Sequence, residues 1–256
     1  MATQIFLIRH GETPWSLAGR HTGRTDVALT AEGERSASRL RGRLEGIAFA
    51  HVLTSPRQRA RRTCELAGLG ALARAEPELE EWDYGDYEGR TTADIHARHP
   101  EWNLFQDGCP QGESVEQVSQ RADRLLASLQ AQEGNVALFS HGHFLRALAM
   151  RWVGLPVRQG RHFALGPASL SMLGHEHPHE KIPAIYSHFF HRFTLGSNRS
   201  CLPVNGNAGH LFDQVFAGGI WIHLKSACSV IQRVAILFYR RRRTVNNNGR
   251  KGFSGF

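Results

Sequence analysis

Short apolar runs recur along the first 180 residues of the chain, and each is followed directly by polar residues or glycine. Gln4–Ile8, His51–Thr54 and Val136–Phe139 have the length and apolar content of buried strands. Leu170–Leu173 is a further run of this kind. The pattern therefore predicts buried strands at these places.

Helical periodicity fills the segments between the apolar runs. Thr30 can cap a helix in which small and apolar residues recur at helical spacing as far as Ile47. Ser55-Pro56 is a favourable N-cap and N1 pair for a helix that extends to about Leu66. Both patterns predict helices that follow a strand.

The remaining helical segments follow the same rule. They are a short helix from Thr91 that ends by Pro100, a helix opened by the capping box Ser114–Gln117, and a helix from His143 to about Val153 with Gly154 after its end. Strands that alternate with helices indicate α/β architecture. We therefore predict a three-layer α/β/α fold with a mostly parallel central sheet for residues 1–180.

The regular alternation stops near residue 180. Residues 181–256 have no sustained period and contain the basic run Arg240–Arg243 and three consecutive asparagines. Residues 1–180 contain no lysine and 22 of the 23 acidic residues, whereas residues 181–256 contain all three lysines and the remaining acid, Asp213. We therefore hypothesise that residues 181–256 are a basic tail, either disordered or a non-native extension such as a frameshifted or read-through end. The alternative is a genuine small basic module.

The net charge of +8 arises in this tail, because residues 1–180 carry slightly more acids than arginines. We therefore do not predict nucleic-acid binding for the main domain, and we interpret Arg240–Arg243 as part of a disordered tail. The four cysteines form no CxxC pair, which fits a reducing compartment. No signal-peptide pattern and no uncharged apolar run of about 20 residues is visible. We expect a cytoplasmic protein that does not associate with membranes.

Basic and imidazole side chains follow the predicted strands at the points where they end. Arg9 and His10 follow the first strand, His141 follows the third, and Arg59 lies near the start of the helix after the second. In open α/β sheets, ligands bind at the carboxyl ends of the strands. Two guanidiniums, two imidazoles and a helix N-terminus suit a phosphoryl group, because Arg matches phosphate oxygens bidentately. Each residue alone has an ordinary structural explanation, and only their shared sheet edge favours a site.

A phosphoryl pocket also needs a nucleophile and a proton donor. An imidazole nitrogen can attack phosphorus and form a phosphohistidine, and a carboxylic acid can protonate the leaving alkoxide. The acidic cluster at residues 80–86 offers Glu80, Glu81 and Asp83 beside aromatic side chains. The residue types alone leave open which of the three is the donor.

In this order, the motifs resemble those of the histidine phosphatase superfamily, which includes the cofactor-dependent phosphoglycerate mutases and many phosphatases. The matching motifs are Arg9-His10-Gly11-Glu12-Thr13, Ser55-x3-Arg59-Ala60-x2-Thr63, Glu81-x2-Tyr84-Gly85-x2-Glu88-Gly89 and Ser140-His141-Gly142. The resemblance covers roughly residues 3–175 and implies a phosphoglycerate mutase-like fold. It implies His10 as nucleophile, Glu81 as proton donor, and Arg9, Arg59 and His141 as ligands of the phosphoryl group, with no metal and no cofactor.

Longer strings narrow the resemblance to one branch of the family. SPRQRARRT, EWDYGDYEG, WNLFQDGC and HGHFLR are most similar to sedoheptulose-1,7-bisphosphatase-type and broad-specificity phosphatases. The residues assigned to substrate binding by this resemblance are His21, Thr22, Trp82, Asp83, Tyr84 and Arg146, with Thr13 and Ser16 near the phosphate. Ser16 stands where many members carry Asn. The leading prediction is a phosphatase that hydrolyses small phosphomonoesters, either sugar phosphates or bisphosphates, through a phosphohistidine on His10.

Two other functions stay open at this point. Phosphoglycerate mutase-type phosphoryl transfer would use the same catalytic core, but the mutases that this chain resembles have a longer insertion between the donor motif and the second catalytic His. A non-catalytic protein that binds through its basic tail is the other alternative. The tract His175–Glu180 resembles a metal-binding sequence, and we interpret it as a Pro-containing loop at the end of a domain.

Overall fold

A computed structural model of the chain describes residues 4–130, 132–175, 183–187, 214–217 and 220–223. The chain divides into two compact units, Met1–Tyr186 and Ser187–Phe256. The predicted boundary at residue 180 lies before this division, and the tract His175–Glu180 lies outside the described residues except for His175.

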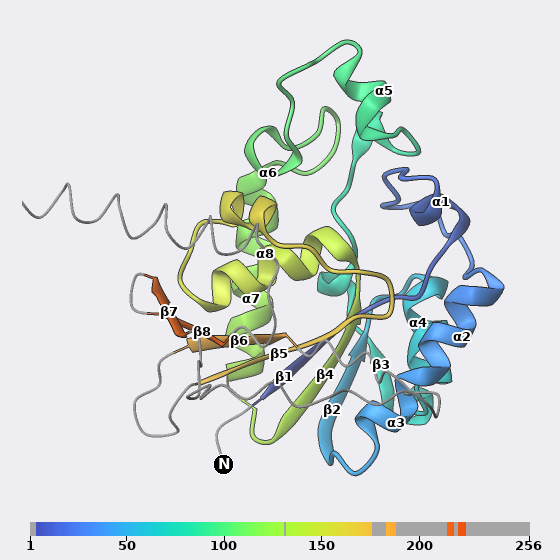
Figure 1. Ribbon diagram of the computed structural model, residues 1–256, viewed down its shortest axis with the longest axis vertical. Helices are drawn as coiled ribbons and strands as arrows, with labels where there is room; N and C mark the ends of the chain where they lie inside the picture. Colours follow the sequence, from blue (N-terminus) through green and yellow to red (C-terminus); the bar gives the residue numbers. More distant parts are fainter. Residues whose placement is uncertain (1–3, 131, 176–182, 188–213, 218–219, 224–256) are drawn as a thin grey trace, which may run out of the picture. The chain divides into compact units, whose positions relative to one another are not determined.

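The first unit contains the alternating strands and helices that the sequence pattern predicts (Figure 1). Its strands are β1 (Ile5–Arg9), β2 (Phe49–Thr54), β3 (Ala73–Ala75), β4 (Asn135–Ser140), β5 (Leu170–His175) and β6 (Pro183–Ser187). Its helices are α1 (Pro14–Leu17), α2 (Ala31–Arg39), α3 (Arg41–Leu44), α4 (Gln58–Leu66), α5 (Thr92–His96), α6 (Leu104–Asp107), α7 (Val115–Gln130) and α8 (Gly142–Trp152). Short 3-10 helices are η1 (Gly70–Leu72), η2 (Pro77–Leu79), η3 (Gly85–Tyr87) and η4 (Val157–His162).

The central sheet has six strands in the order β3-β2-β4-β1-β5-β6. β2 runs parallel to β3 and to β4, and β4 runs parallel to β1, whereas β5 is antiparallel to β1. Arg9 pairs with Ser140, and Thr54 pairs with Phe139. The residues that follow these strands therefore leave the same edge of the sheet. The prediction of a mostly parallel α/β fold is confirmed.

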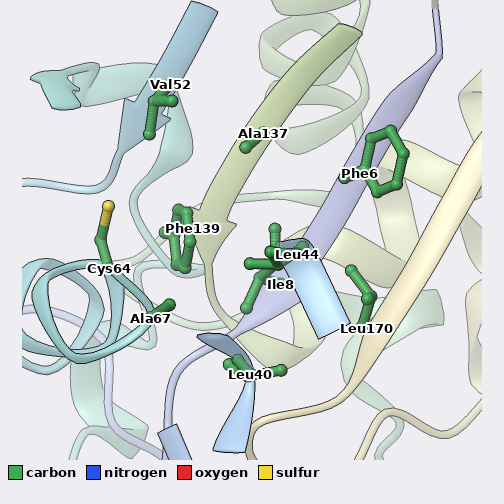
Figure 2. Close-up of a cluster of buried hydrophobic side chains, with 10 residues drawn as sticks. All are labelled: Phe6, Ile8, Leu40, Leu44, Val52, Cys64, Ala67, Ala137, Phe139 and Leu170. Atoms are coloured by element: carbon green, nitrogen blue, oxygen red, sulfur yellow. The ribbon is translucent and has the colours of Figure 1, made fainter. Parts of the chain in front are cut away.

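Helices cover both faces of the sheet (Figure 1). On one face, side chains of α2, α3 and α4 pack against alternate residues of the strands, as expected where successive side chains point to opposite faces. Figure 2 shows this cluster, which comprises Phe6, Ile8, Leu40, Leu44, Val52, Cys64, Ala67, Ala137, Phe139 and Leu170. Helices α7 and α8 lie on the other face, where α8 buries nearly its whole length. The sheet is thus the middle of three layers.

Local signals predict most of the helix starts correctly. The Thr30 side chain caps α2 through the Gly33 N–H, and Ser114 and Gln117 exchange the two hydrogen bonds of a capping box. Thr91 caps α5 with a capping box to Asp94. These three predictions are confirmed.

The predicted start of α4 is wrong. The helix begins at Gln58 with Arg57 as its N-cap, and the Ser55 hydroxyl both contacts His141 at 2.8 Å and accepts from the Arg57 N–H at 3.3 Å. The Gln58 N–H is taken by the Asp26 carboxylate at 2.8 Å. A distant side chain therefore caps this helix, which a local sequence pattern cannot reveal.

In the second unit, β7 (Gln214–Ala217) and β8 (Ile220–His223) form a two-stranded antiparallel sheet. β6 lies past the predicted domain boundary and belongs to the main sheet. None of the described helices is both long and apolar enough to cross a bilayer.

Candidate active site

The five residues predicted to be catalytic come together at the carboxyl ends of β1, β2 and β4. The imidazole rings of His10 and His141 lie 5.2 Å apart between centroids. Burial lowers the pKa of both Arg9 and Arg59, while the nearby charge of Glu81 acts in the opposite direction on each. The distance between the two rings and the electrostatic effects among the charged groups show that two imidazoles, two guanidiniums and one carboxylate lie close together at this edge of the sheet.

His10 is a neutral imidazole with one defined tautomer. Its Nδ1 lies 2.7 Å from the carbonyl oxygen of Gly11, and because a carbonyl only accepts, Nδ1 carries the proton. Burial lowers the pKa of His10 well below its usual value, and Arg9 and Arg59 lower it further. The neutral ring therefore has its lone pair on Nε2. A lone pair on a fixed, neutral imidazole is what a nucleophile requires.

The second imidazole, His141, is held by Arg59. The Arg59 Nε donates to Nδ1 of His141 at 3.1 Å, so the proton of the neutral ring lies on Nε2, which donates to the Ser55 hydroxyl at 2.8 Å. Burial, followed by the charge of Arg59, lowers the pKa of His141 well below its usual value. The Arg59 guanidinium also donates to carbonyls of the 22–25 loop. Arg59 thus orients His141 and ties this loop to α4.

Arg9 lies against the start of α8. Its guanidinium donates to the carbonyl of Leu165, and its buried Nε has no hydrogen-bond partner in the described structure. A Cβ on Gly142 would lie 3.1 Å from that Nε, so a larger residue there would push the Arg9 guanidinium by a few tenths of an ångström. The unpaired donor makes Arg9 suitable for binding an anion.

Glu81 accepts three backbone hydrogen bonds. Its Oε1 accepts from the N–H groups of Trp82 and Phe144 at 3.0 and 2.8 Å, and its Oε2 accepts from the N–H of His143 at 3.1 Å. His143 and Phe144 belong to the first turn of α8, so the carboxylate caps the positive end of this helix. With two donors on Oε1 and one on Oε2, Oε2 is the oxygen that can still carry a proton.

Three predicted substrate-binding residues form the wall beside this cluster. The His21 ring lies 4.8 Å from Tyr84 between centroids, and the Arg146 guanidinium stacks 4.5 Å from the centroid of Phe105. Burial lowers the pKa of Arg146 to about 10, and the charge of Glu81 opposes this effect. Tyr84 and Arg146 therefore lie within electrostatic reach of the catalytic cluster, and His21 packs against Tyr84.

His143 belongs to the same wall, although the sequence reading did not select it. The Tyr84 hydroxyl lies 2.6 Å from its Nδ1, and burial lowers the pKa of His143 well below its usual value. Burial also raises the pKa of Tyr84 well above its usual value, so the phenol stays protonated and donates to the neutral ring. The signal in the sequence was a second imidazole two residues after His141, at the start of the same helix.

The structure places the other predicted contacts differently. The hydroxyls of Thr13 and Ser16 form the reciprocal capping box of α1, and the Thr22 hydroxyl donates to the Arg20 carbonyl. The Trp82 indole is fully buried and donates to the Glu113 carbonyl.

Asp83 forms a salt bridge of 2.7 Å with Arg24. Trp82, Asp83 and Ser16 therefore have structural partners for their polar atoms, and we do not include them in the proposed substrate pocket.

The cluster has an excess of positive charge. None of the guanidiniums of Arg9, Arg59 and Arg146 forms a salt bridge with a carboxylate of a described residue. Within the same part of the chain, no three His, Cys, Asp or Glu side chains converge as a metal-binding group. Buried guanidiniums without carboxylate partners are suited to a dianionic guest such as a phosphoryl group.

Comparison with known proteins identifies the family. Residues 5–187 match the histidine phosphatase superfamily (branch 1). The chain belongs to the histidine phosphatase superfamily. The chain is 46% identical over 179 residues to the acid phosphatase of Mycobacterium tuberculosis, and the match covers 68% of this chain and 87% of that protein.

Other relatives are named for two different activities, a bisphosphatase and a phosphoglycerate mutase. The chain is 34% identical over 191 residues to the sedoheptulose 1,7-bisphosphatase of Saccharomyces cerevisiae, covering 62% of this chain and 70% of that protein. It is 35% identical over 183 residues to the "Probable phosphoglycerate mutase GpmB" of Klebsiella pneumoniae, covering 68% and 85%. The solved structure of the Rv3214 product of M. tuberculosis is similar with a TM-score of 0.66 and 43% identity, covering 72% of this chain and 95% of that one. The family match and the relatives named as phosphatases show that this chain is a phosphatase. Its fold is the phosphoglycerate mutase-like fold.

Proposed function

We propose that this phosphatase hydrolyses small phosphate monoesters through a phosphohistidine formed on Nε2 of His10. The observation that carries the proposal is the hydrogen bond from Nδ1–H of His10 to the Gly11 carbonyl, which leaves Nε2 unprotonated beside guanidiniums that have no carboxylate partner among the described residues. Arg9 and Arg59 are the proposed ligands of the phosphoryl oxygens, and His141 is the imidazole beside them. Fixed cations that surround the phosphorus favour the charge that spreads over its oxygens during transfer.

In the first step, the lone pair of His10 Nε2 forms a bond to phosphorus while the bond from phosphorus to the ester oxygen breaks. The leaving oxygen takes the proton from Oε2 of Glu81, so that a neutral alcohol departs. The Gly11 carbonyl accepts the remaining ring N–H of the phosphorylated imidazole. Glu81 is left as a carboxylate that accepts three backbone N–H groups.

In the second step, water attacks the phosphohistidine and its proton passes to the Glu81 carboxylate. The bond from phosphorus to Nε2 breaks, and its electron pair returns to the ring. Inorganic phosphate leaves, His10 is neutral again, and the proton taken from water is on Glu81. One carboxyl group therefore serves as acid and then as base.

The wall beside the cluster suits a polar, hydroxyl-bearing leaving group. His21, Tyr84 and His143 offer neutral hydrogen-bonding atoms, and Arg146 supplies one cation. These groups match sugar hydroxyls and a further anionic group, and the similarity to a sedoheptulose 1,7-bisphosphatase supports this class of substrate. We include His21, Tyr84 and Arg146 in the proposed substrate pocket, and Thr22 supports the site indirectly, because its carbonyl accepts from Arg59.

Mutase-type phosphoryl transfer is the second candidate, because several relatives are named as phosphoglycerate mutases. The two activities differ in whether water or a second substrate takes the phosphoryl group. Glu81 is connected to β4 by a segment that contains η3 and the helices α5, α6 and α7, with no longer insertion among the described residues. The mutases that this chain resembles have a longer insertion between these motifs, so the length of this segment supports the hydrolase.

The test measures both reactions on one preparation. We expect phosphate release from p-nitrophenyl phosphate and from members of a sugar-phosphate panel, with no fast isomerisation of 3-phosphoglycerate in the presence of 2,3-bisphosphoglycerate. His10→Ala should abolish release, and His99→Gln, at an exposed imidazole, should not change it. Rapid isomerisation without phosphate release would contradict the proposal.

The same assay tests the role of the basic tail. We propose that residues 5–187, which match the family, hold the whole activity and that residues 188–256 do not contribute to it. A chain that ends at Ser187 should then have the same kcat/KM as the full chain. Loss of activity in the folded, shortened protein would show that the second unit takes part.

A further inference from the structure

Arg121, on α7, is a buried cation that does not belong to the phosphoryl cluster. Only 8% of the residue is exposed, and every N–H of its guanidinium has an acceptor. Nε and one Nη2–H bind the two oxygens of the Glu113 carboxylate, each at 2.8 Å. Nη1 donates to the carbonyls of Glu78 and Glu80 at 2.9 and 2.7 Å, and Nη2 donates to the carbonyl of Glu81 at 3.3 Å.

These acceptors surround a single position in the chain. The three carbonyls lie at Glu81 and in the residues just before it, so Arg121 fixes the backbone that leads into the proposed proton donor. Five donors in a rigid, planar fork can meet several carbonyls at once, and an ammonium group cannot reproduce this geometry. The guanidinium therefore restrains the direction in which the Glu81 side chain leaves the backbone.

Glu113 restrains the backbone on the other side of Glu81. Its Oε2 accepts from the N–H of Asp83 at 2.9 Å, and its carbonyl accepts from the Trp82 indole at 2.8 Å. The Glu113 N–H donates to the Asp83 carbonyl at 2.9 Å. The ion pair of Arg121 and Glu113 thus holds the residues before and after Glu81 together.

Arg121 also contacts the helix that binds the Glu81 carboxylate. Its guanidinium carbon lies 4.1 Å from the centroid of the Phe144 ring, and the Phe144 N–H donates to Oε1 of Glu81. Arg121 therefore contacts both the backbone of Glu81 and Phe144, whose N–H donates to the Glu81 carboxylate. A buried ion pair is often no more stabilising than apolar residues of the same volume, so stability alone does not account for this arrangement.

We propose that Arg121, paired with Glu113, is a positioning residue for Glu81, which it holds at the distance and angle needed to protonate the leaving group. This inference rests on the proposed role of Glu81 as proton donor. Arg121 does not touch the substrate in this account, and its effect passes through Glu81. A displacement of about 1 Å at a catalytic group can cost on the order of a hundredfold in rate.

The test compares leaving groups. An alkyl phosphate needs a proton on its leaving oxygen, whereas p-nitrophenolate departs without one, so a misplaced donor slows the phosphorylation of His10 by the alkyl phosphate only. The ratio kcat/KM reports this step, whereas kcat also includes hydrolysis of the phosphohistidine, in which Glu81 serves both substrates as base. We expect the double variant Arg121→Met/Glu113→Gln, which leaves no buried charge unpaired, to lose on the order of tenfold to a hundredfold in kcat/KM on alkyl phosphates. Its kcat/KM on p-nitrophenyl phosphate should fall by less than about threefold, because the phosphoryl cluster is untouched. Arg121→Lys is the milder variant, and it should show the same selectivity if the double variant does not fold.

Arg124→Met is the matched control. Arg124 lies one turn further along α7, with its side chain 59% exposed, and it also binds the Glu78 side chain. This variant should change neither rate. Equal losses of kcat/KM on both kinds of substrate for the Arg121 variants would show that Arg121 is a purely structural residue and would overturn the proposal.

Glu81→Gln separates this inference from the function on which it rests. If Glu81 is the donor, Glu81→Gln loses alkyl phosphatase activity selectively, and adding Arg121→Lys to it causes no further selective loss. If Glu81→Gln shows selectivity and the Arg121 variants do not, the positioning role alone is wrong. If Glu81→Gln shows no selectivity, the donor assignment fails and the positioning role fails with it.

Discussion

At the scale of single residues, hydrogen bonds and burial decide which atoms of the site can react. The Gly11 carbonyl fixes the proton of His10 on Nδ1, and Arg59 fixes the proton of His141 on Nε2. Burial and the surrounding guanidiniums keep both rings neutral by lowering their pKa values. The positive charge of the site therefore comes from its arginines, and the histidines are neutral. A neutral His10 has an imidazole lone pair beside these cations.

The buried histidines also predict how the stability of the phosphatase depends on pH. Burial lowers the pKa of His21 to about 4, while the unfolded chain titrates near the ordinary value of 6.5. Between these values the unfolded state binds more protons, so the free energy of unfolding falls as the pH falls through this window. His21 alone should account for about 2 kcal/mol between pH 7 and pH 5.

Urea unfolding of the wild type and of His21→Gln at both pH values measures this contribution. The variant should lose less stability on acidification than the wild type, whereas His99→Gln, at an exposed site, should behave as the wild type. If His21→Gln lost as much free energy of unfolding between pH 7 and pH 5 as the wild type, His21 would not be held neutral by the fold.

The five residues that the sequence assigns to catalysis meet at one edge of the sheet, whereas some of the residues that it assigns to substrate binding have polar partners elsewhere in the fold. Arg9, His10, Arg59, Glu81 and His141 stand in motifs at strand ends, and the parallel sheet brings such ends together. Trp82 and Asp83 stand in the same strings, but nothing local reveals that their polar atoms bind Glu113 and Arg24. Side-chain direction within a loop depends on distant partners, and a single sequence does not contain that information.

At the scale of elements, the loop at residues 22–25 joins the catalytic cluster to the rest of the fold. Its carbonyls accept from Arg59, and its N–H groups at Gly23 and Thr25 donate to the Glu88 carboxylate at 3.0 Å. A Cβ on Gly23 would lie 2.6 Å from the Trp82 carbonyl, so this close approach requires glycine. Glu88 therefore supports Arg59 through the backbone of the loop.

Glu88→Gln should weaken this support. Hydrogen bonds from backbone N–H groups to a charged carboxylate contribute more than neutral ones, so we expect the free energy of unfolding to fall by about 2 kcal/mol. Chemical denaturation measures the change, and Glu45→Gln, at an exposed carboxylate of the α3 C-cap, is the control. Equal stability of the wild type and Glu88→Gln would contradict a structural role for the loop anchor.

Helices and strands with strong local signals were predicted, and those without them were not. Thr30, Thr91 and Ser114 begin helices as their caps predict, since the signal lies within one turn. β3 is short and carries only Ala73, Arg74 and Ala75, so it has no hydrophobic pattern to find. It exists because its backbone pairs with β2, which is a tertiary cause.

At the scale of the whole molecule, the break in composition and the break in structure lie close together. The chain divides after Tyr186, and the family match ends at residue 187, a few residues past the point where lysine first appears. β6 lies a few residues past the boundary expected at residue 180, and it belongs to the main sheet. The proposal that the second unit does not serve the chemistry is independent of how that unit folds.

The central claim is that the phosphoryl group is carried by Nε2 of His10, and trapping the intermediate tests it most directly. The phosphatase is mixed with a ³²P-labelled sugar phosphate, quenched in alkali within milliseconds, and digested for mass spectrometry. We expect label that is stable in alkali and lost in acid, located on the peptide that contains His10 and absent in His10→Ala. Label on another residue, or full turnover by His10→Ala, would contradict the account.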